Sequence, residues 1–127
     1  MRLSAVKYTD LLKKNNEYAK NLPEDVYAIT TLSNIVVEHL NYILEYSLRV
    51  DGVPAMLSAS DYDNIVQDSQ KNQHSNAIII FWELCNIIDG FQYKIELLDT
   101  SQLDAIIEKI KSEIDFVLNN LEQTPLV

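Results

Sequence analysis

The segment AIIIFWELCNIIDGFQYKIELL, residues 77–98, fits two secondary structures, and the choice between them sets the fold class. As a helix it is apolar almost all round, which is typical of a helix at the centre of a core. As two strands it places a hairpin turn at Asp89-Gly90, and four apolar residues then alternate with polar ones: Phe91, Tyr93, Ile95 and Leu97. The helix is favoured, because helical patterns flank the segment and an isolated two-stranded hairpin is marginally stable in water.

The clearest helical pattern precedes this segment. Pro23 suits the first turn of a helix, and Glu24 and Asp25 favour the positive end of its dipole. Apolar residues then recur every three or four positions as far as Arg49, which predicts a helix of about 27 residues, or about 40 Å. The turn residues Asp51-Gly52-Val53-Pro54 end it.

The remaining segments predict further helices. One runs from a cap at Ser4 to about Lys20, and a short one extends from Ser60 to about Asp68, followed by a polar loop over residues 70–76. The last begins with Ser101 and Asp104, which resemble a capping box, and continues to Leu121 before a frayed tail at residues 123–127.

We therefore expect one all-α domain over residues 1–127, a bundle of four or five helices. The scarcity of turn residues, with 2 glycines and 3 prolines, agrees with long helices. An α+β fold with a hairpin around Asp89-Gly90 is the alternative.

Charge is the most informative part of the composition. Nineteen acidic residues oppose ten basic ones, for a net charge of −9. The first 20 residues carry +3, so the rest carries −12. Phosphate backbones and anionic membranes repel such a surface, so we expect no direct nucleic-acid or membrane binding. A basic protein partner is favoured by long-range attraction. The alternative is that the acidity only keeps the protein in solution.

No pattern of catalytic or metal-binding residues is found. His39 and His74 lack the spacing of zinc-protease and di-iron helices. The stretch from Asp61 begins like a calcium loop, but Val66 and Asn72 replace its required glycine and glutamate. Two glycines are too few for a phosphate-binding loop. We expect no enzyme activity, no metal and no cofactor.

Cys85 is the single cysteine, so no internal disulfide can form, and it is expected to be a small buried apolar residue. The start of the chain lacks the apolar run of a signal peptide, and no apolar run is long enough to cross a membrane. The absence of a disulfide and of these two apolar runs favours a cytoplasmic location.

In size, acidity, single-domain build and lack of enzyme motifs, the chain resembles the immunity proteins of bacterial contact-dependent growth inhibition and of nuclease bacteriocins. The resemblance implies an inhibitor that binds a basic toxin, a nuclease domain, and masks its active site. It also implies a monomer that forms a complex with its cognate toxin. Seven tyrosines agree with a binding role, because tyrosine is enriched at protein interfaces.

Two acidic regions are predicted to contact the partner. The first comprises Asp61, Tyr62, Asp63 and Asp68, and the second is the acidic face of the last helix, with Asp104, Glu108 and Asp115. The alternative function is a non-catalytic adaptor or regulatory subunit that binds a partner through an apolar groove. A third possible function is mimicry of DNA, in which Asp104, Glu108 and Asp115 would copy the spacing of phosphate groups. Lys109 and Lys111 weaken it, because they interrupt this row of acidic side chains.

Overall fold

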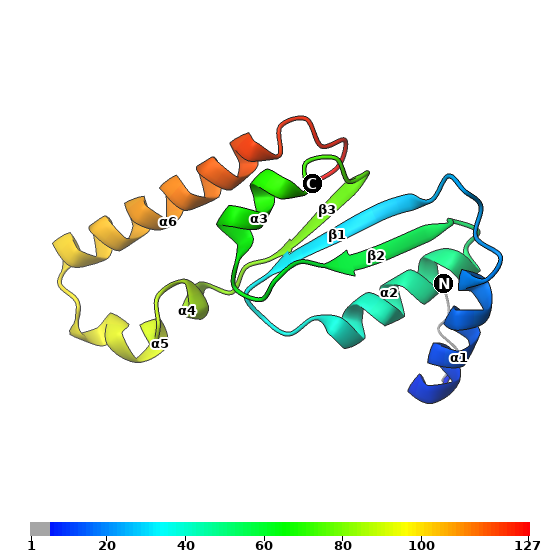
Figure 1. Cartoon of the computed structure of the whole chain (residues 1–127). Helices are drawn as coiled ribbons and strands as arrows, with labels where there is room; N and C mark the ends of the chain where they lie inside the picture. Colours follow the sequence, from blue (N-terminus) through cyan, green and yellow to red (C-terminus); the bar gives the residue numbers. More distant parts are fainter. Residues whose placement is uncertain (1–5) are drawn as a thin grey trace.

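The protein is a layered α/β structure built on a small parallel sheet (Figure 1). The computed structural model describes residues 6–127. The elements in chain order are α1 (Tyr8–Ala19), β1 (Tyr27–Ser33), α2 (Glu38–Val50), β2 (Ala55–Ala59), α3 (Ile65–Lys71), β3 (Ala77–Phe81), α4 (Leu84–Ile87), α5 (Phe91–Lys94), η1 (Ile95–Leu97) and α6 (Thr100–Asn120).

The sheet has the strand order β2-β1-β3, and both strand pairs are parallel. Ile29 of the central strand lies opposite Leu57 on one side and Ala77 on the other. Helix α2 covers one face of the sheet, whereas α3 and the C-terminal end of α6 cover the other (Figure 1). The prediction of an all-α bundle was therefore wrong, and so was the hairpin alternative, because every strand pair is parallel and separated by a helical crossover.

Each face of the sheet has its own apolar core. On the α3 side, the core consists of Leu32, Ile65, Ile78, Val117 and Leu121. On the α2 side, a smaller cluster comprises Ile29, Ala55 and Ala77, with Leu48 of α2 packed against it. Alternate residues of β1 thus enter different cores, which the two-fold period of a strand requires.

The long helix predicted over residues 23–49 was only half correct. Its second half is α2, but its first half contains β1, whose last five residues are all buried. A central parallel strand is covered on both faces and shows no polar alternation. The apolar spacing of Ile29, Leu32 and Val36 therefore matched a helix by coincidence, although the β-branched residues Ile29, Thr30 and Thr31 favour a strand.

The segment 77–98 is neither one helix nor a hairpin. Its first five residues form β3, and short helical turns follow. Gly90 has φ +68°, in the left-handed region, and separates α4 from α5. A short apolar run of this kind fits a buried strand and a buried helix equally well, so periodicity alone could not separate them.

Other elements also begin or end at residues that differ from the predicted ones. The short helix expected over residues 60–68 is α3, which begins only at Ile65 and extends to Lys71, so the predicted loop starts two residues later. The tail is not frayed, because the Leu126 carbonyl accepts a hydrogen bond from the Ile78 amide (2.9 Å) and extends the sheet beside β3. The first helix begins at Tyr8, and its predicted cap, Ser4, lies outside the described residues.

The N-terminal cap of α6 also differs from the predicted one. Asp99 accepts a hydrogen bond from the Gln102 amide (2.8 Å), and the Gln102 side chain accepts one from the Asp99 amide (3.0 Å). This reciprocal pair is a capping box, two residues before the predicted pair Ser101 and Asp104.

We expect Asp99→Ala to lower the free energy of unfolding by about 1 kcal/mol, because it removes this cap. Ser101→Ala lies inside the helix and should change it by less than about 0.5 kcal/mol. Urea unfolding followed by circular dichroism measures both. A larger loss for Ser101→Ala would show that the helix starts where the sequence pattern placed it.

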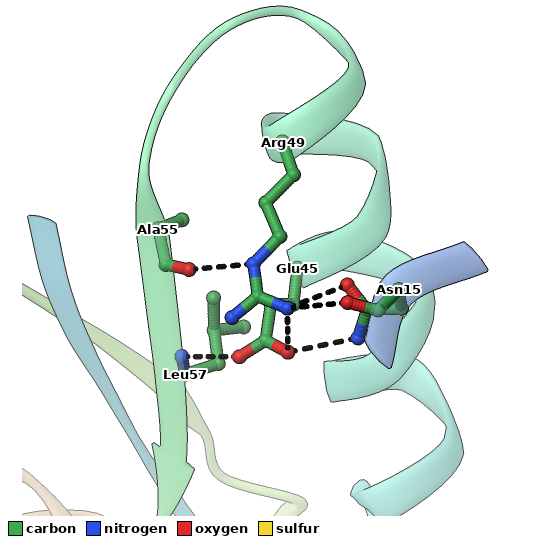
Figure 2. Close-up of polar contacts among 5 residues, drawn as sticks. All are labelled: Asn15, Glu45, Arg49, Ala55 and Leu57. Carbon is green, nitrogen blue, oxygen red and sulfur yellow. Dashed lines mark hydrogen bonds and ion pairs between the residues drawn. The ribbon is translucent and has the colours of Figure 1, made fainter. Parts of the chain in front are cut away.

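A buried polar network ties α1, α2 and the outer edge of β2 together (Figure 2). Arg49 and Glu45 form an ion pair (3.1 Å), with side chains only 4% and 12% exposed. Arg49 Nε donates to the Ala55 carbonyl (2.9 Å), and the Leu57 amide donates to Glu45 Oε2 (2.7 Å). Asn15 of α1 donates to Glu45 Oε1 (2.8 Å) and accepts from Arg49 through Oδ1 (2.8 Å) and its carbonyl (3.1 Å). The two side chains of α2 thus form hydrogen bonds with backbone groups on the outer edge of β2. Without these bonds, the backbone groups would be free to pair with another strand.

Candidate functional site at the carboxyl ends of the strands

The loops after the three strands meet at one edge of the sheet, because all three strands are parallel. The chain moves from β1 to β2 on one side and then crosses to β3 on the other, so the strand order reverses at β1. In open α/β sheets, ligands bind outside the carboxyl ends of the strands at such a reversal. A ligand site is therefore expected where β1 and β3 end.

Asn34, the residue after β1, is completely buried and joins these two strand ends. Its side chain donates to the Glu83 carbonyl (2.9 Å) and accepts from the Glu83 amide (2.6 Å). Asn86 in turn donates to the Asn34 carbonyl and to the Glu83 carboxylate, both at 3.0 Å. These contacts fix the course of the chain from β3 into α4 and thereby hold Trp82 and Asn86 at the sheet edge.

A cleft of about 330 Å³ opens beside this junction, between α3, α4 and α6. We call it the Trp82 cleft. Its lining residues are Asp63, Ile65, Val66, Gln67, Trp82, Asn86, Ile87 and Glu113. Two of them are carboxylates, two are amides, the rest are apolar or aromatic, and none is basic. An aromatic wall beside carboxylates favours a cationic group, through charge attraction and through contact with the indole face.

Asp63 is held in place by its backbone. Its φ of +52° makes it the one non-glycine residue in the described chain with positive φ, a conformation that Asp and Asn tolerate better than other side chains. Its amide donates to the Ser33 carbonyl (3.0 Å), which ties the loop after β2 to the end of β1. Backbone conformations of this kind cluster at functional sites.

The first predicted region is divided by the structure. Asp61 and Tyr62 are exposed in the same loop, and Asp63 lines the Trp82 cleft. Asp68 is only 3% exposed. It accepts hydrogen bonds from the Asp61 amide (3.1 Å) and from Asn64 (2.9 Å), and it pairs with Lys71 (3.6 Å). Asp68 therefore positions the loop and does not belong to the surface that a partner would contact.

The second predicted region lies on α6, away from the cleft. Asp104, Glu108 and Asp115 are exposed, and Glu108 pairs with Lys111 (3.1 Å). At 3.6 residues per turn these three acids share one flank of the helix. Beside that flank run three exposed apolar side chains, Ile107, Ile114 and Leu118. Glu113, which lines the cleft, lies on the other flank of the same helix.

Helix α6 extends well beyond the sheet. Its C-terminal end packs on α3, whereas its N-terminal half runs outward above α5 (Figure 1). The segment before it is also exposed, and Leu97 of η1 is 82% exposed. We call α4 to α6 the C-terminal arm. Residues 83–127, which include the arm, carry nine acidic side chains and three lysines, a net charge of −6.

Sequence reasoning selected Asp63 but missed the other polar and aromatic residues that build the cleft. Trp82, Glu113, Asn34 and Asn86 come from three separate segments, and only the order of the strands brings them together. The one available signal was Asn34, a polar residue directly after a strand-like run. It was hidden because that run was assigned to a helix.

Tyrosine and histidine side chains outside the cleft make packing and hydrogen-bond contacts. Tyr46 is buried edge-on against Tyr18, with ring centroids 6.2 Å apart. The Tyr8 hydroxyl lies 2.7 Å from His39 Nδ1. Partial burial raises the pKa of the Tyr8 hydroxyl above its usual value, and Tyr42 and Glu38 add to the rise. Cys85 is only partly buried, not fully as expected.

Within residues 6–127, no group of three or more His, Cys, Asp or Glu side chains is arranged to hold a metal ion. In the same part of the chain, no helix combines the length and the apolar character needed to cross a membrane. Comparisons of the chain with protein-family models, curated proteins and solved structures found no match.

Proposed function

We propose that this protein is a non-catalytic binding module for a basic protein partner. The Trp82 cleft takes a cationic side chain of that partner, with Asp63 and Glu113 balancing its charge and Trp82 covering its flat face. The observation that supports this most directly is the lining of the cleft, which combines two carboxylates with one indole and contains no basic side chain. Arginine suits such a site best, because its guanidinium both pairs with carboxylates and stacks on aromatic rings.

The C-terminal arm supplies the rest of the proposed contact surface. Exposed apolar side chains on α6 lie next to the acids Asp104, Glu108 and Asp115. An apolar strip with an acidic border complements a partner with an apolar patch surrounded by lysines and arginines. Asp61 and Tyr62, exposed in the loop that also contains Asp63, extend this surface.

The most specific form of the proposal is an inhibitor of the immunity-protein kind. In this form the partner is a cytoplasmic toxin with a nuclease domain, whose phosphate-binding site is basic and would be masked by the acidic surface. The protein would be a monomer until it binds. The second candidate, an adaptor, is favoured by one observation, the exposure of Leu97, Ile107 and Leu118 on the arm.

A capture experiment with matched charge variants tests the proposal. The tagged protein is compared with the double variant Asp63→Asn/Glu113→Gln, and bound proteins are eluted in a salt gradient and identified. Asn tolerates the positive φ of Asp63, so the variant removes charge with little backbone strain. We expect the double variant to lose about 2 kcal/mol or more of binding free energy, roughly thirtyfold in affinity.

The control is Glu24→Gln/Asp25→Asn, which removes the same charge from exposed positions. These residues precede β1 and so lie at the amino ends of the strands, whereas the cleft lies at the carboxyl ends. A basic protein bound by wild type and control but lost from the cleft variant supports the proposal. Equal recovery with all three proteins would contradict it. If the captured protein is a nuclease that the module inhibits, the inhibitor form is favoured over the adaptor.

A further inference from the structure

The strand β2 lies at one edge of the sheet, and part of its outer side is open (Figure 1). The Ser60 amide donates to the Thr31 carbonyl (2.9 Å), so the backbone groups of residue 60 point toward β1. Because these groups alternate from side to side along a strand, those of Ala55, Leu57 and Ala59 point to the outer edge.

Side chains of α2 cover only the first part of this edge. The Ala55 carbonyl accepts a hydrogen bond from Arg49, and the Leu57 amide donates one to Glu45. Beyond them, the Leu57 carbonyl and both backbone groups of Ala59 have no hydrogen-bond partner within residues 6–127. Ala59 is also exposed. Unpaired backbone groups on an edge strand are a template for the addition of another strand.

A further strand can form three backbone hydrogen bonds here in either direction. In a parallel strand, one residue donates to the Leu57 carbonyl and accepts from the Ala59 amide, and the next residue but one donates to the Ala59 carbonyl. In an antiparallel strand, one residue exchanges both bonds with Ala59, and the next but one donates to the Leu57 carbonyl. Glu45 already accepts from the Leu57 amide, so pairing is confined to the carboxyl end of β2.

A groove beside the open edge provides room for the side chains of an added strand. It measures about 360 Å³ and lies between α2, with Glu38 and Tyr42, and β2, with Leu57 and Ala59. Glu38 forms no ion pair with any lysine or arginine in the described part of the chain. A basic side chain that points into the groove therefore meets an unpaired carboxylate.

The other face of β2 favours apolar side chains. Successive side chains of a strand point to opposite faces, so Met56 lies on the face away from this groove, where it is 48% exposed. A segment that alternates basic and apolar residues matches both faces at once, with its basic side chains toward Glu38 and its apolar ones toward Met56.

We propose that the partner adds an extended basic segment to the open end of β2, as a fourth strand of the sheet. The basic character of the partner rests on the function proposed above, whereas the open edge does not. A second copy of this chain fits poorly, because each copy carries a net charge of −9. The added strand ends beside the loop with Asp61 and Tyr62, and so continues the surface assigned to the partner.

Amide hydrogen exchange followed by two-dimensional NMR tests the strand addition, with a short peptide of alternating lysine and valine as the probe. At a peptide concentration about ten times Kd, the Ala59 amide should exchange roughly tenfold more slowly, because only the unbound fraction exchanges. The control peptide has the same sequence but carries a methyl group on every backbone nitrogen. It cannot donate to the two carbonyls and should give no protection.

A pair of variants at one position tests the backbone contact from the protein side. Ala59→Pro removes the outward amide without removing a bond to β1, whereas Ala59→Val keeps the amide in a residue of similar size. We expect Ala59→Pro to bind the lysine–valine peptide about tenfold more weakly than Ala59→Val. Glu38→Gln should weaken binding several-fold. Equal affinity of the two Ala59 variants, or no protection of Ala59 in the wild type, would overturn the proposal.

The cleft and the edge can fail separately. Asp63→Asn/Glu113→Gln should leave the protection of Ala59 unchanged, and Ala59→Pro should leave the response of Trp82 fluorescence to an arginine peptide unchanged. A response at Trp82 without protection of Ala59 would overturn the strand addition alone. Protection of Ala59 without a response at Trp82 would support the strand addition and contradict the role proposed for the cleft.

Discussion

Glu45→Gln is expected to lower the free energy of unfolding by about 3–5 kcal/mol, because it leaves the buried Arg49 guanidinium without its counter-charge. The carboxylate also accepts from Asn15 and from the Leu57 amide, so the change affects α1, α2 and the edge of β2 together (Figure 2). Domains of this kind are stable by about 5–15 kcal/mol, so such a loss is a large fraction of the total. Urea unfolding monitored by circular dichroism measures it.

Glu108→Gln is the matched control. It makes the same substitution in a helix, and Glu108 also pairs with a base one turn away, Lys111. Both side chains of that pair are mostly exposed, so the loss should be between about 0 and 1 kcal/mol. If the two variants lost equal stability, the Glu45 network would not have the buried, edge-covering role assigned to it.

Leu121→Ala is expected to cost about 2–5 kcal/mol, the range for removing a large buried apolar side chain. Leu121 is almost fully buried among Leu32, Ile65, Ile78 and Val117, and so joins the end of α6 to α3 and the sheet. The variant should also expose the amides of α6 to faster hydrogen exchange, because this core is what attaches the C-terminal arm.

Ile107→Ala tests the other half of the same helix. Ile107 is exposed on the part of α6 that extends beyond α3, so its removal should change stability by less than about 1 kcal/mol. Under the proposed function it should nevertheless weaken partner binding. A loss of stability as large as that of Leu121→Ala would mean that the outer half of α6 is packed and not available to a partner.

The helical parts of the chain could be predicted from the sequence where a polar face was present. Helix α6 was anticipated almost to its full length, because its apolar stripe from Leu103 to Leu121 borders a charged flank. Helix α2 was anticipated for the same reason. Their partner strands were not, because β1 and β3 are covered on both faces and show no alternation. Without the strands, a parallel sheet could not be distinguished from a bundle.

The candidate site was harder to predict than the fold. Asp63 was selected for its charge, and it lines the cleft, but Asp68 was selected on the same ground and is an internal hydrogen-bond acceptor. Charge alone does not report burial. Trp82 and Glu113 are 31 residues apart in the sequence, and only the position of β3 beside β1 brings them to one cleft.

The central claim, that the Trp82 cleft binds cationic side chains, can be tested by tryptophan fluorescence. Trp82 is the only tryptophan in the chain, so its emission reports on the cleft alone. The protein is titrated with a hexa-arginine peptide at low and high salt, beside Asp63→Asn/Glu113→Gln and the control Glu24→Gln/Asp25→Asn. The account predicts a saturable change of emission for wild type and control that weakens with salt and is lost in the cleft variant. An unchanged emission, or an equal response from all three proteins, would contradict it.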